Sequence, residues 1–160
     1  MRAAAHALAG LAVASLWLGA DMSDPIHAAA VAVACVVAAL APDCDHPRSP
    51  AGRILHVPVG HRSPWTHSLV PAAVVGCAFL SYPPLSFLAF PVGASWLVHV
   101  AIDGLTRSGV PMLWPLSSSP VRLAGGPLRV GTSDEVLIAA AAAVFALIPW
   151  LPQIVVRLGI

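Results

Sequence analysis

The sequence has few charged residues for its length. Of its 160 residues, 9% are charged and 58% are hydrophobic, whereas a typical soluble domain carries roughly 25% charged residues. A short chain exposes a large share of its surface when folded, and eight basic and seven acidic side chains are too few to cover that surface. The composition therefore argues against a soluble domain and favours an integral membrane protein. It also excludes disorder, because disordered chains are poor in apolar residues and rich in charge.

Two further shortages narrow the possible functions. The chain has three cysteines, two of which (Cys35 and Cys77) lie inside apolar runs, so there is no disulfide framework. The formal net charge is +1, which indicates neither nucleic acid nor an acidic partner. The expected partner is the lipid bilayer itself.

Five apolar stretches approach the length of about 20 residues that a helix needs to cross a bilayer. They cover residues 3–20, 26–41, 68–81, 85–105 and 135–156. The second and third are short, so one is expected to be tilted, re-entrant or packed inside the bundle, which leaves four crossings as an alternative. A capping box at residues 132–135 should start the last helix, and Pro149 and Pro152 should kink or fray it. We predict one membrane-embedded domain, residues 1–160, built as an all-α bundle of about five transmembrane helices.

The first stretch also resembles a signal peptide. Arg2 is followed by an apolar run and by small residues before Asp21. The ionisable His6 inside that run argues against cleavage, so we interpret residues 3–20 as a helix of the mature protein.

Topology assigns the two longer polar segments, residues 43–67 and 106–134, to one side of the membrane. Five crossings place both segments on the side of the N-terminus. That side would carry all the arginines except Arg157, namely Arg2, Arg48, Arg53, Arg62, Arg107, Arg122 and Arg129. Because positively charged residues favour the cytoplasm, we predict that this side is cytoplasmic.

Ionisable side chains concentrate in two regions of the sequence. Residues 43–67 contain nine of them: Asp43, Asp45, His46, Arg48, Arg53, His56, His61, Arg62 and His67. In the second region His99 and Asp103 are four residues apart, which places them on one face of a helix. Ionisable groups inside an apolar span are costly and usually face the bundle interior with a partner.

The predicted topology brings eight His and Asp side chains to one membrane face. These candidate metal ligands are His6, Asp43, Asp45, His46, His61, His67, His99 and Asp103. Imidazole and carboxylate donors suit Zn, Mn or Fe better than Ca or Mg. Eight donors exceed one tetrahedral site, so they would furnish two ions, or one ion with carboxylates that orient the imidazoles. A metal-bound water of lowered pKa is a nucleophile at neutral pH, and two metals can hold both oxygens of a phosphoester.

Four linked motifs cover most of the chain from His6 to about Leu123. They read Pro42-Asp43-x-Asp45-His46, His61-Arg62-x-x-Thr66-His67-Ser68, His99-x-x-x-Asp103-x-x-Thr106 and Gly109-Val110-Pro111-x-Leu113-Trp114-Pro115. In order and spacing they resemble the YdjM-like family of inner-membrane, metal-dependent hydrolases. One departure is Ala5, because the family often has Thr before its first His. The family is more distantly similar to zinc-dependent phospholipases C and P1-type nucleases, which are all-helical enzymes with clustered zinc ions. The resemblance thus implies phosphoester hydrolysis on a lipid-like or membrane-proximal substrate.

We therefore expect a multi-pass hydrolase of a bacterial-type inner (cytoplasmic) membrane, with its metal site at the cytoplasmic end. It would bind one or two divalent transition metal ions, zinc first and Mn or Fe second, and act through metal-bound hydroxide. Asp43 and Asp45 are the candidate catalytic carboxylates, one of which could act as general base. Arg62 and Arg107 could each clamp a phosphate, because a guanidinium fits two phosphate oxygens at once.

Each of these residues also has a purely structural interpretation. His99 and Asp103 could be a buried hydrogen-bonded pair, residues 43–46 a solvated turn, and His61 and His67 interfacial histidines beside Trp65. The alternative function is a non-enzymatic membrane protein whose cluster is a structural metal site or a docking surface. A metal transporter is less favoured, since its ligands should lie near the bilayer midplane.

Overall fold

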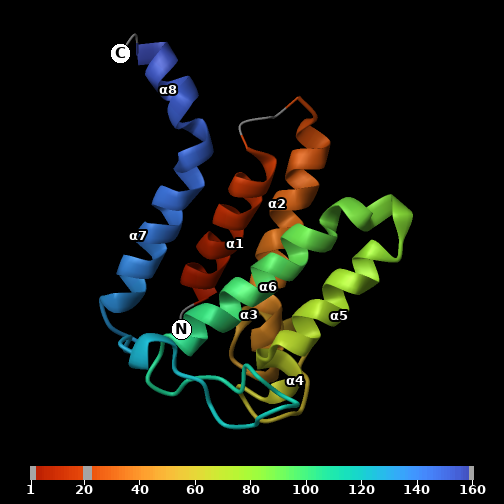
Figure 1. Ribbon diagram of the computed structural model, residues 1–160, viewed down its shortest axis with the longest axis vertical. Coiled ribbons are helices and arrows are strands. Elements are labelled where there is room, and N and C mark those ends of the chain that lie inside the picture. The colour runs from red at the N-terminus through yellow and green to blue at the C-terminus, as the bar shows by residue number, and fades with distance from the viewer. Residues whose placement is uncertain (1–2, 20–22, 159–160) are drawn as a thin grey trace.

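Apolar helices account for most of the computed structural model, which describes residues 3–19 and 23–158. The main helices are α1 (Ala3–Leu18), α2 (Pro25–Leu40), α5 (Leu69–Leu80), α6 (Ala89–Gly104) and α7 (Asp134–Leu147). They coincide with the five predicted stretches and run alternately up and down (Figure 1). The prediction of an all-α fold is confirmed.

Within the described residues, three helical stretches are long and apolar enough to cross a membrane. They are Pro25–Asp45, Pro83–Gly104 and Asp134–Val156. The other two apolar helices, α1 with 16 residues and α5 with 12, are shorter. Figure 1 shows α5 lying along α6, both inclined relative to α2. The structure thus bears out three candidate spans, and the count of five crossings stays a prediction.

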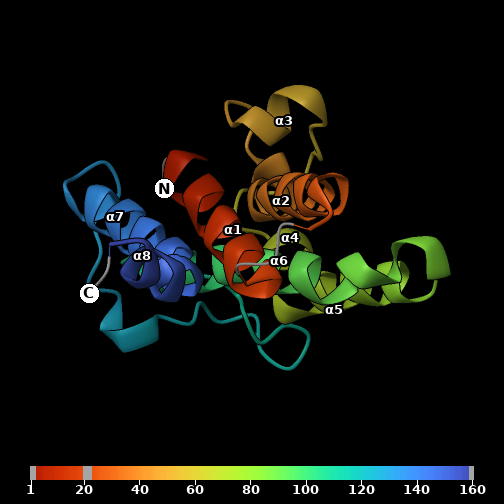
Figure 2. The same ribbon diagram turned by 90° about the horizontal axis from the view of Figure 1, so that it is seen from above.

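Helix α1 occupies the centre of the bundle and contacts α2, α6 and α7 (Figure 2). Its buried positions are small residues, among them Ala5, Ala9 and Gly10. A Cβ at Gly10 would lie 2.7 Å from the carbonyl oxygen of Cys35, so glycine is required for α1 and α2 to approach this closely. Close packing of α1 is what carries His6 into the interior.

Proline and side-chain caps set most helix ends. The Asp24 carboxylate accepts hydrogen bonds from the backbone N–H groups of Ile26 and His27, both at 3.0 Å, which starts α2 at Pro25. The fourth predicted stretch, residues 85–105, lies within two residues at each end of the helical span Pro83–Gly104, in which the 3₁₀ segment η2 (Pro83–Leu88) leads into α6. Two consecutive prolines begin η2, where a backbone N–H has no partner within the helix.

The last helix begins and breaks where the sequence predicts. It begins at Asp134, although the predicted capping box is not reciprocal: Glu135 accepts from the N–H of Gly131 instead of Thr132. The prolines interrupt it, so that α7 is followed by η4 (Ile148–Trp150) and α8 (Leu151–Leu158). The turn predicted before Pro25 falls partly on residues 20–22, and these lie outside the described residues, as does Arg2.

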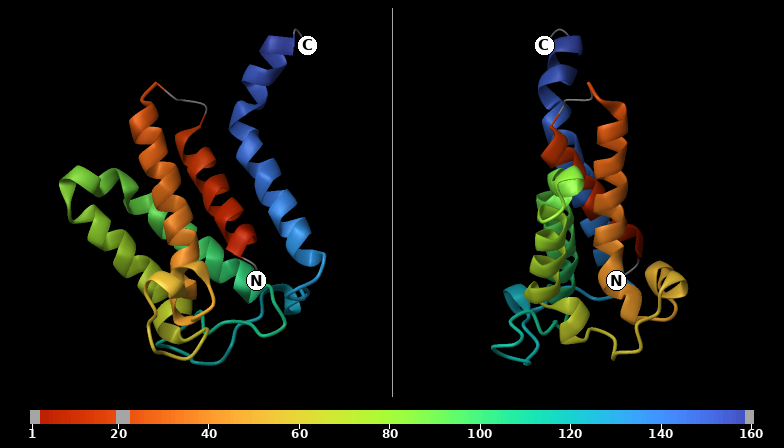
Figure 3. Two further views of the ribbon diagram at one scale, coloured as in Figure 1. Left: turned by 180° about the vertical axis from the view of Figure 1, so that it is seen from behind. Right: turned by 90° about the vertical axis from the view of Figure 1, so that its right-hand side faces the viewer.

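Both polar segments lie at the same end of the bundle as the start of α1 (Figures 1 and 3). The first segment is more regular than its sequence indicates, since it contains η1 (Ala41–Asp45), α3 (Pro50–Ile54) and α4 (Pro64–His67). The second is largely irregular, with η3 (Leu123–Gly125) and isolated bridges joining Thr106 to Leu128 and Val110 to Val121. We call this end the polar end.

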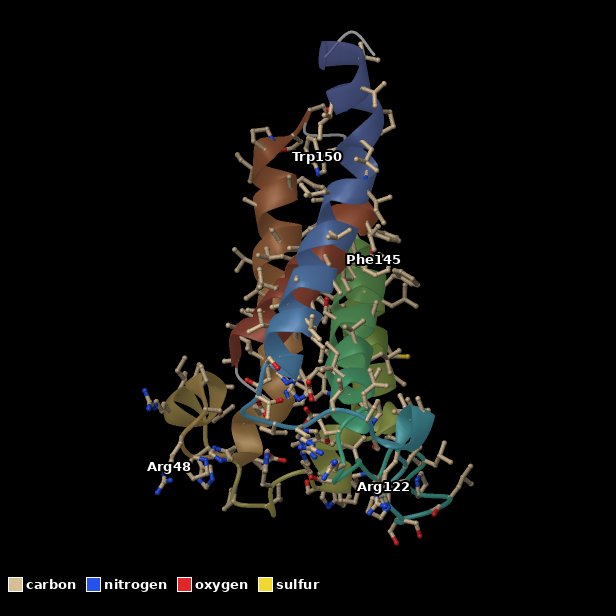
Figure 4. The ribbon with its side chains drawn as sticks, turned by 90° about the vertical axis from the view of Figure 1, so that its left-hand side faces the viewer. Arg48, Arg122, Phe145 and Trp150 are labelled. Atoms are coloured by element: carbon tan, nitrogen blue, oxygen red, sulfur yellow. The ribbon has the colours of Figure 1, made fainter. Side chains whose placement is uncertain are left out.

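Large apolar side chains cover the outer faces of the helices. Exposed examples are Val37 on α2, Val74 on α5, Phe90 on α6 and Phe145 on α7. Figure 4 shows Phe145 and Trp150 along the helical length and Arg48 and Arg122 at the polar end. An apolar surface this extensive is suited to lipid rather than to water.

Candidate metal centre

The structure brings seven of the eight candidate ligands together inside the polar end. His6 lies in the first turns of α1, and His99 and Asp103 lie in the last turns of α6. Asp43 and Asp45 come from η1, His67 ends α4, and His61 precedes α4. Helices distant in sequence therefore meet at one point. The rings of His6, His67 and His99 are fully buried.

A backbone carbonyl fixes the orientation of His99. The Nδ1 atom of its ring donates to the carbonyl oxygen of Ala39 at 2.7 Å, since a carbonyl can only accept. In the neutral ring the proton is on Nδ1, so Nε2 carries a lone pair. That lone pair faces Nε2 of His67 at 3.3 Å and Oδ1 of Asp43 at 3.8 Å. A metal-binding histidine typically has its other ring nitrogen held in this way.

Thr66 gives His67 the matching orientation. The Thr66 hydroxyl donates to Oδ2 of Asp45 at 2.6 Å, and its oxygen lies 2.9 Å from Nδ1 of His67. Because the hydroxyl proton is committed to the carboxylate, Nδ1 of His67 is the donor in the second bond. The lone pair on Nε2 of His67 then points into the cluster, 3.7 Å from Asp103 and 3.9 Å from Asp43. The indole N–H of Trp96 holds this turn by donating to the Thr66 carbonyl at 3.1 Å.

His6, Asp103 and Arg62 form the opposite wall of the cluster. The His6 ring stacks on His99 with ring centroids 3.8 Å apart, and its Nε2 lies 3.5 Å from Oδ1 of Asp103. The Arg62 guanidinium pairs with Oδ2 of Asp103 at 3.0 Å and donates to the Thr106 hydroxyl at 2.9 Å. Arg62 thus reaches the cluster, but its guanidinium is already engaged there and its side chain is 13% exposed.

Asp45 serves as an acceptor for three surrounding groups. Oδ1 accepts from Nδ1 of His61 at 2.8 Å, and Oδ2 accepts from the Arg62 backbone N–H at 2.9 Å as well as from Thr66. The His61 ring, with 41% of its side chain exposed, turns its other nitrogen away from Asp45. Asp45 therefore orients two histidines, His61 directly and His67 through Thr66.

His46 is the candidate ligand that the structure leaves apart. Its Nδ1 accepts from the Arg48 backbone N–H at 3.2 Å, and its ring meets the edge of the His61 ring at 4.8 Å between centroids. Among the described residues, the groups whose donor atoms lie within 4.8 Å of one another are His6–Asp43–His99, His67–His99–Asp103 and Asp43–Asp45–His61. His46 belongs to none of these groups.

The donor chemistry of these three overlapping groups fits a divalent transition metal. Each combines imidazole nitrogen with carboxylate oxygen, which are donors that Zn, Mn and Fe accept. Asp43 and His99 each belong to two of the groups, so the arrangement could hold one ion or two adjacent ions.

A cavity of about 630 Å³ opens onto the cluster. Its wall includes Asp43, His46, His61 and Arg62 from the motifs, and also Arg48 and Ser108. This volume is typical of a small-molecule site.

Arg107, which the sequence suggested as a phosphate clamp, is exposed and does not line the cavity, whereas Arg48 does. The roles of Arg48, Thr66 and Trp96 at the site were not predicted from the sequence, although Thr66 lies inside one of the four motifs.

Comparison with known proteins identifies relatives of this chain. A family profile described as "YdjM inner membrane protein" matches residues 1–158. The inner membrane protein YdjM of Escherichia coli (strain K12) and that of Shigella flexneri are each 32% identical over 133 residues, covering 72% of this chain and 66% of the relative. The chain thus spans about two thirds of the length of these relatives, and no solved structure matches. The family resemblance predicted from the four motifs is confirmed, and the chain belongs to the YdjM inner membrane protein family.

Proposed function

We propose that this chain is a metal-dependent phosphoester hydrolase of the inner membrane, acting on a lipid-like or membrane-proximal substrate. The observation that carries the proposal is the convergence of the Nε2 atoms of His67 and His99 with Asp43 and Asp103, at 3.3–3.9 Å, in a buried cluster below a cavity. The buried cluster supports the metal-binding part of the proposal, and the cavity supports the binding of a substrate beside the metal.

The electrostatics of the buried cluster support the binding of a cation. Two imidazole lone pairs face each other, and two carboxylates lie within 4 Å of them. Like charges and lone pairs this close repel, and burial removes the water that would screen them. Arg62 neutralises Asp103, whereas the Asp43 carboxylate faces His67 and His99 at 3.9 and 3.8 Å, and among the described residues no arginine is paired with it, so its charge and both lone pairs would favour a cation. A divalent cation would satisfy both.

The metal site that we propose uses the full candidate set, as ligands or as groups that hold the ligands in place, with zinc first and Mn or Fe as alternatives. It comprises His6, Asp43, Asp45, His46, His61, His67, His99 and Asp103. Within it, Asp45 orients other ligands, and His46 stands at the margin. A metal bound in such a site supplies Lewis-acid activation of water and of phosphoester oxygens.

The surrounding residues would position the substrate and accept a proton from the attacking water. Asp43 belongs to the cluster and also lines the cavity, so its carboxylate can take a proton from an attacking water. Asp45 would assist by holding His61 and His67 in place. Arg62 lines the cavity next to Asp103, where its guanidinium can stabilise a phosphate oxygen as well as the carboxylate.

The proposal includes a topology for the whole chain. The domain would be one membrane-embedded unit, residues 1–160, crossing the bilayer five times. Its polar end would face the cytoplasm, because that end carries the arginines of both polar segments. A cysteine introduced at exposed Ser118 should then be shielded from impermeant thiol reagents added outside intact cells, and one introduced at exposed Ser23 should be labelled.

Elemental analysis of the purified protein tests the metal. We expect a stoichiometric transition metal, lost on chelation and restored by Zn or Mn, and hydrolysis of phosphoester lipids or generic phosphatase substrates only in the loaded protein. A protein that stays free of metal after reconstitution would refute the proposal. Bound metal without turnover, together with a His99→Ala protein that unfolds, would instead support a structural metal site.

A further inference from the structure

One wall of the cavity is a rigid turn that connects the cluster to α3. The Ser49 hydroxyl donates to the carbonyl oxygen of Asp43 at 2.7 Å and accepts from the N–H of Gly52 at 2.8 Å. A methyl group at Gly52 would collide with the His46 carbonyl, so the first turn of α3 packs directly on the backbone of the metal-binding segment. The residues between them are therefore held at a fixed distance from the cluster.

Arg48 lies in this turn at the wall of the cavity, and its side chain is exposed. Its backbone N–H is bonded to His46, and within the described part of the chain its guanidinium makes no ion pair or hydrogen bond. Arg62, the other arginine of the cavity wall, already pairs with Asp103, so it has fewer donors left for a ligand than Arg48 has. Arg48 is thus available to an anion that enters the cavity, and a guanidinium binds two phosphate oxygens at once.

The same turn leads to an apolar tip. Ile54 and Leu55, at the end of α3, are 89% and 67% exposed although they lie at the polar end of the molecule. Figures 2 and 4 show α3 standing out beside the bundle rather than beneath it. In an inner membrane protein, exposed apolar side chains placed beside the helices at this level can insert between lipids at the membrane interface.

We infer that the cavity binds the phosphate headgroup of a bilayer glycerophospholipid, which enters from the side past α3. Arg48 holds the phosphate, and Ile54 and Leu55 contact the acyl chains. The volume of about 630 Å³ accommodates a phosphate with its glycerol. This inference rests on the proposed function for what happens to the phosphoester, but the binding step is measured separately from turnover.

Calorimetric titration with a non-hydrolysable probe tests the binding. The probe is a dihexanoyl glycerophosphonolipid, in which carbon replaces the ester oxygen, added to the full chain in amphipol. We expect Arg48→Ala to raise its Kd about tenfold. The matched control is Arg53→Ala, which removes an exposed arginine of α3 that does not line the cavity and should change the Kd less than twofold.

A second pair of variants tests whether the bound phosphate belongs to a lipid. Replacing both Ile54 and Leu55 by serine should weaken the dihexanoyl probe about fivefold and leave glycerol phosphonate, which has no acyl chains, unchanged. Leu116→Ser, at another exposed apolar site of the polar end, serves as its control. Equal affinity for both probes would show that a soluble phosphoester is the ligand and would overturn the lipid assignment.

The remaining outcomes are equally distinct. No binding to wild type, or an Arg48→Ala Kd within twofold of wild type, overturns the inference whatever metal the protein contains. Tight, Arg48-dependent binding by a protein that elemental analysis shows to be free of metal would leave the lipid site standing and would refute the hydrolase proposal alone.

Discussion

Two parts of the His/Asp site differ in how their polar atoms are satisfied. The inner cluster consists of His6, Asp43, His67, His99 and Asp103, and the outer arm consists of Asp45, His46 and His61. In the outer arm Asp45 accepts three hydrogen bonds, and one ring nitrogen of each histidine is also bonded. In the inner cluster the Nε2 atoms of His67 and His99 face each other at 3.3 Å, with Asp43 and Asp103 nearby.

This difference would separate the two tasks of the proposed metal site. Hydrogen bonds already hold Asp45 and one ring nitrogen of each histidine in the outer arm, so it can be ordered before any ion arrives. The inner cluster presents lone pairs and carboxylates whose mutual repulsion a cation would remove. The outer arm therefore supports the ligands, and the inner cluster is where we expect the ion. Substitutions in the two parts should have clearly different effects on metal affinity.

The largest effect is expected for His67→Ala. It removes the Nε2 atom that lies closest to His99 and opens a cavity in a fully buried position. Loss of a direct ligand should cost more than the roughly 10–100-fold in affinity that follows loss of a group supporting one. We expect less than about a tenth of the wild-type metal content by elemental analysis, and no measurable turnover.

His56→Ala is the control for this experiment. His56 is an exposed residue of the same polar segment, and its removal should leave the metal content unchanged. If His67→Ala folds and keeps a full complement of metal, the inner cluster is not the place where the ion binds.

The next largest effect is expected for Asp45→Asn. The substitution keeps the shape of the side chain but turns one of two acceptors into a donor, so either the bond from the Arg62 N–H is lost or the bond with His61 must reverse its direction. Metal affinity, measured by competition with a chromophoric chelator, should fall about 10–100-fold. A loss as complete as that of His67→Ala would make Asp45 itself a ligand and remove the distinction between the two parts.

A smaller effect is expected for Thr66→Val. Valine has nearly the shape of threonine but cannot relay the hydrogen bond between His67 and Asp45. Nδ1 of His67 already lies 3.3 Å from Oδ2 of Asp45, so the two can bond directly after a small shift. We therefore expect only about a fivefold loss of metal affinity, below the usual range for lost ligand support. Thr66→Ser keeps the hydroxyl and should restore the affinity; a serine variant as weak as the valine one would contradict the relay.

The sequence alone predicts the bundle well because its evidence is local. An apolar run of about 20 residues has few alternatives to a membrane helix, and the breaks at Pro149 and Pro152 follow from chemistry within one residue. The family resemblance rests likewise on motifs of contiguous residues. The candidate ligands could be named because ionisable residues are rare in this chain, so the few that occur stand out.

What the sequence could not predict depends on contacts between distant segments. The orientation of His99 is set by the carbonyl of Ala39, 60 residues away, and any residue presents a carbonyl there. Arg48 and Arg107 look alike in the sequence, and only the turn through Ser49 and Gly52 places Arg48 on the cavity. The distinction between Asp43, which faces the cluster, and Asp45, which supports it, also requires the fold. The local sequence does not show which of two carboxylates separated by one residue faces the cluster and which supports it.

The smallest effect is expected for His46→Ala, although its position in a ligand motif would suggest a large one. Its Nδ1 accepts from the Arg48 backbone N–H, its ring meets the edge of the His61 ring, and it belongs to none of the close donor groups found among the described residues. Metal affinity should stay within about twofold of wild type, and the free energy of unfolding within about 1 kcal/mol, because the half-buried His46 side chain lies outside the apolar core. His61→Ala measured alongside should weaken metal binding more, because His61 does join Asp43 and Asp45 in such a group. A tenfold loss with His46→Ala would mean that the outer arm moves inward when the ion binds, so that the two parts of the site form a single shell of ligands.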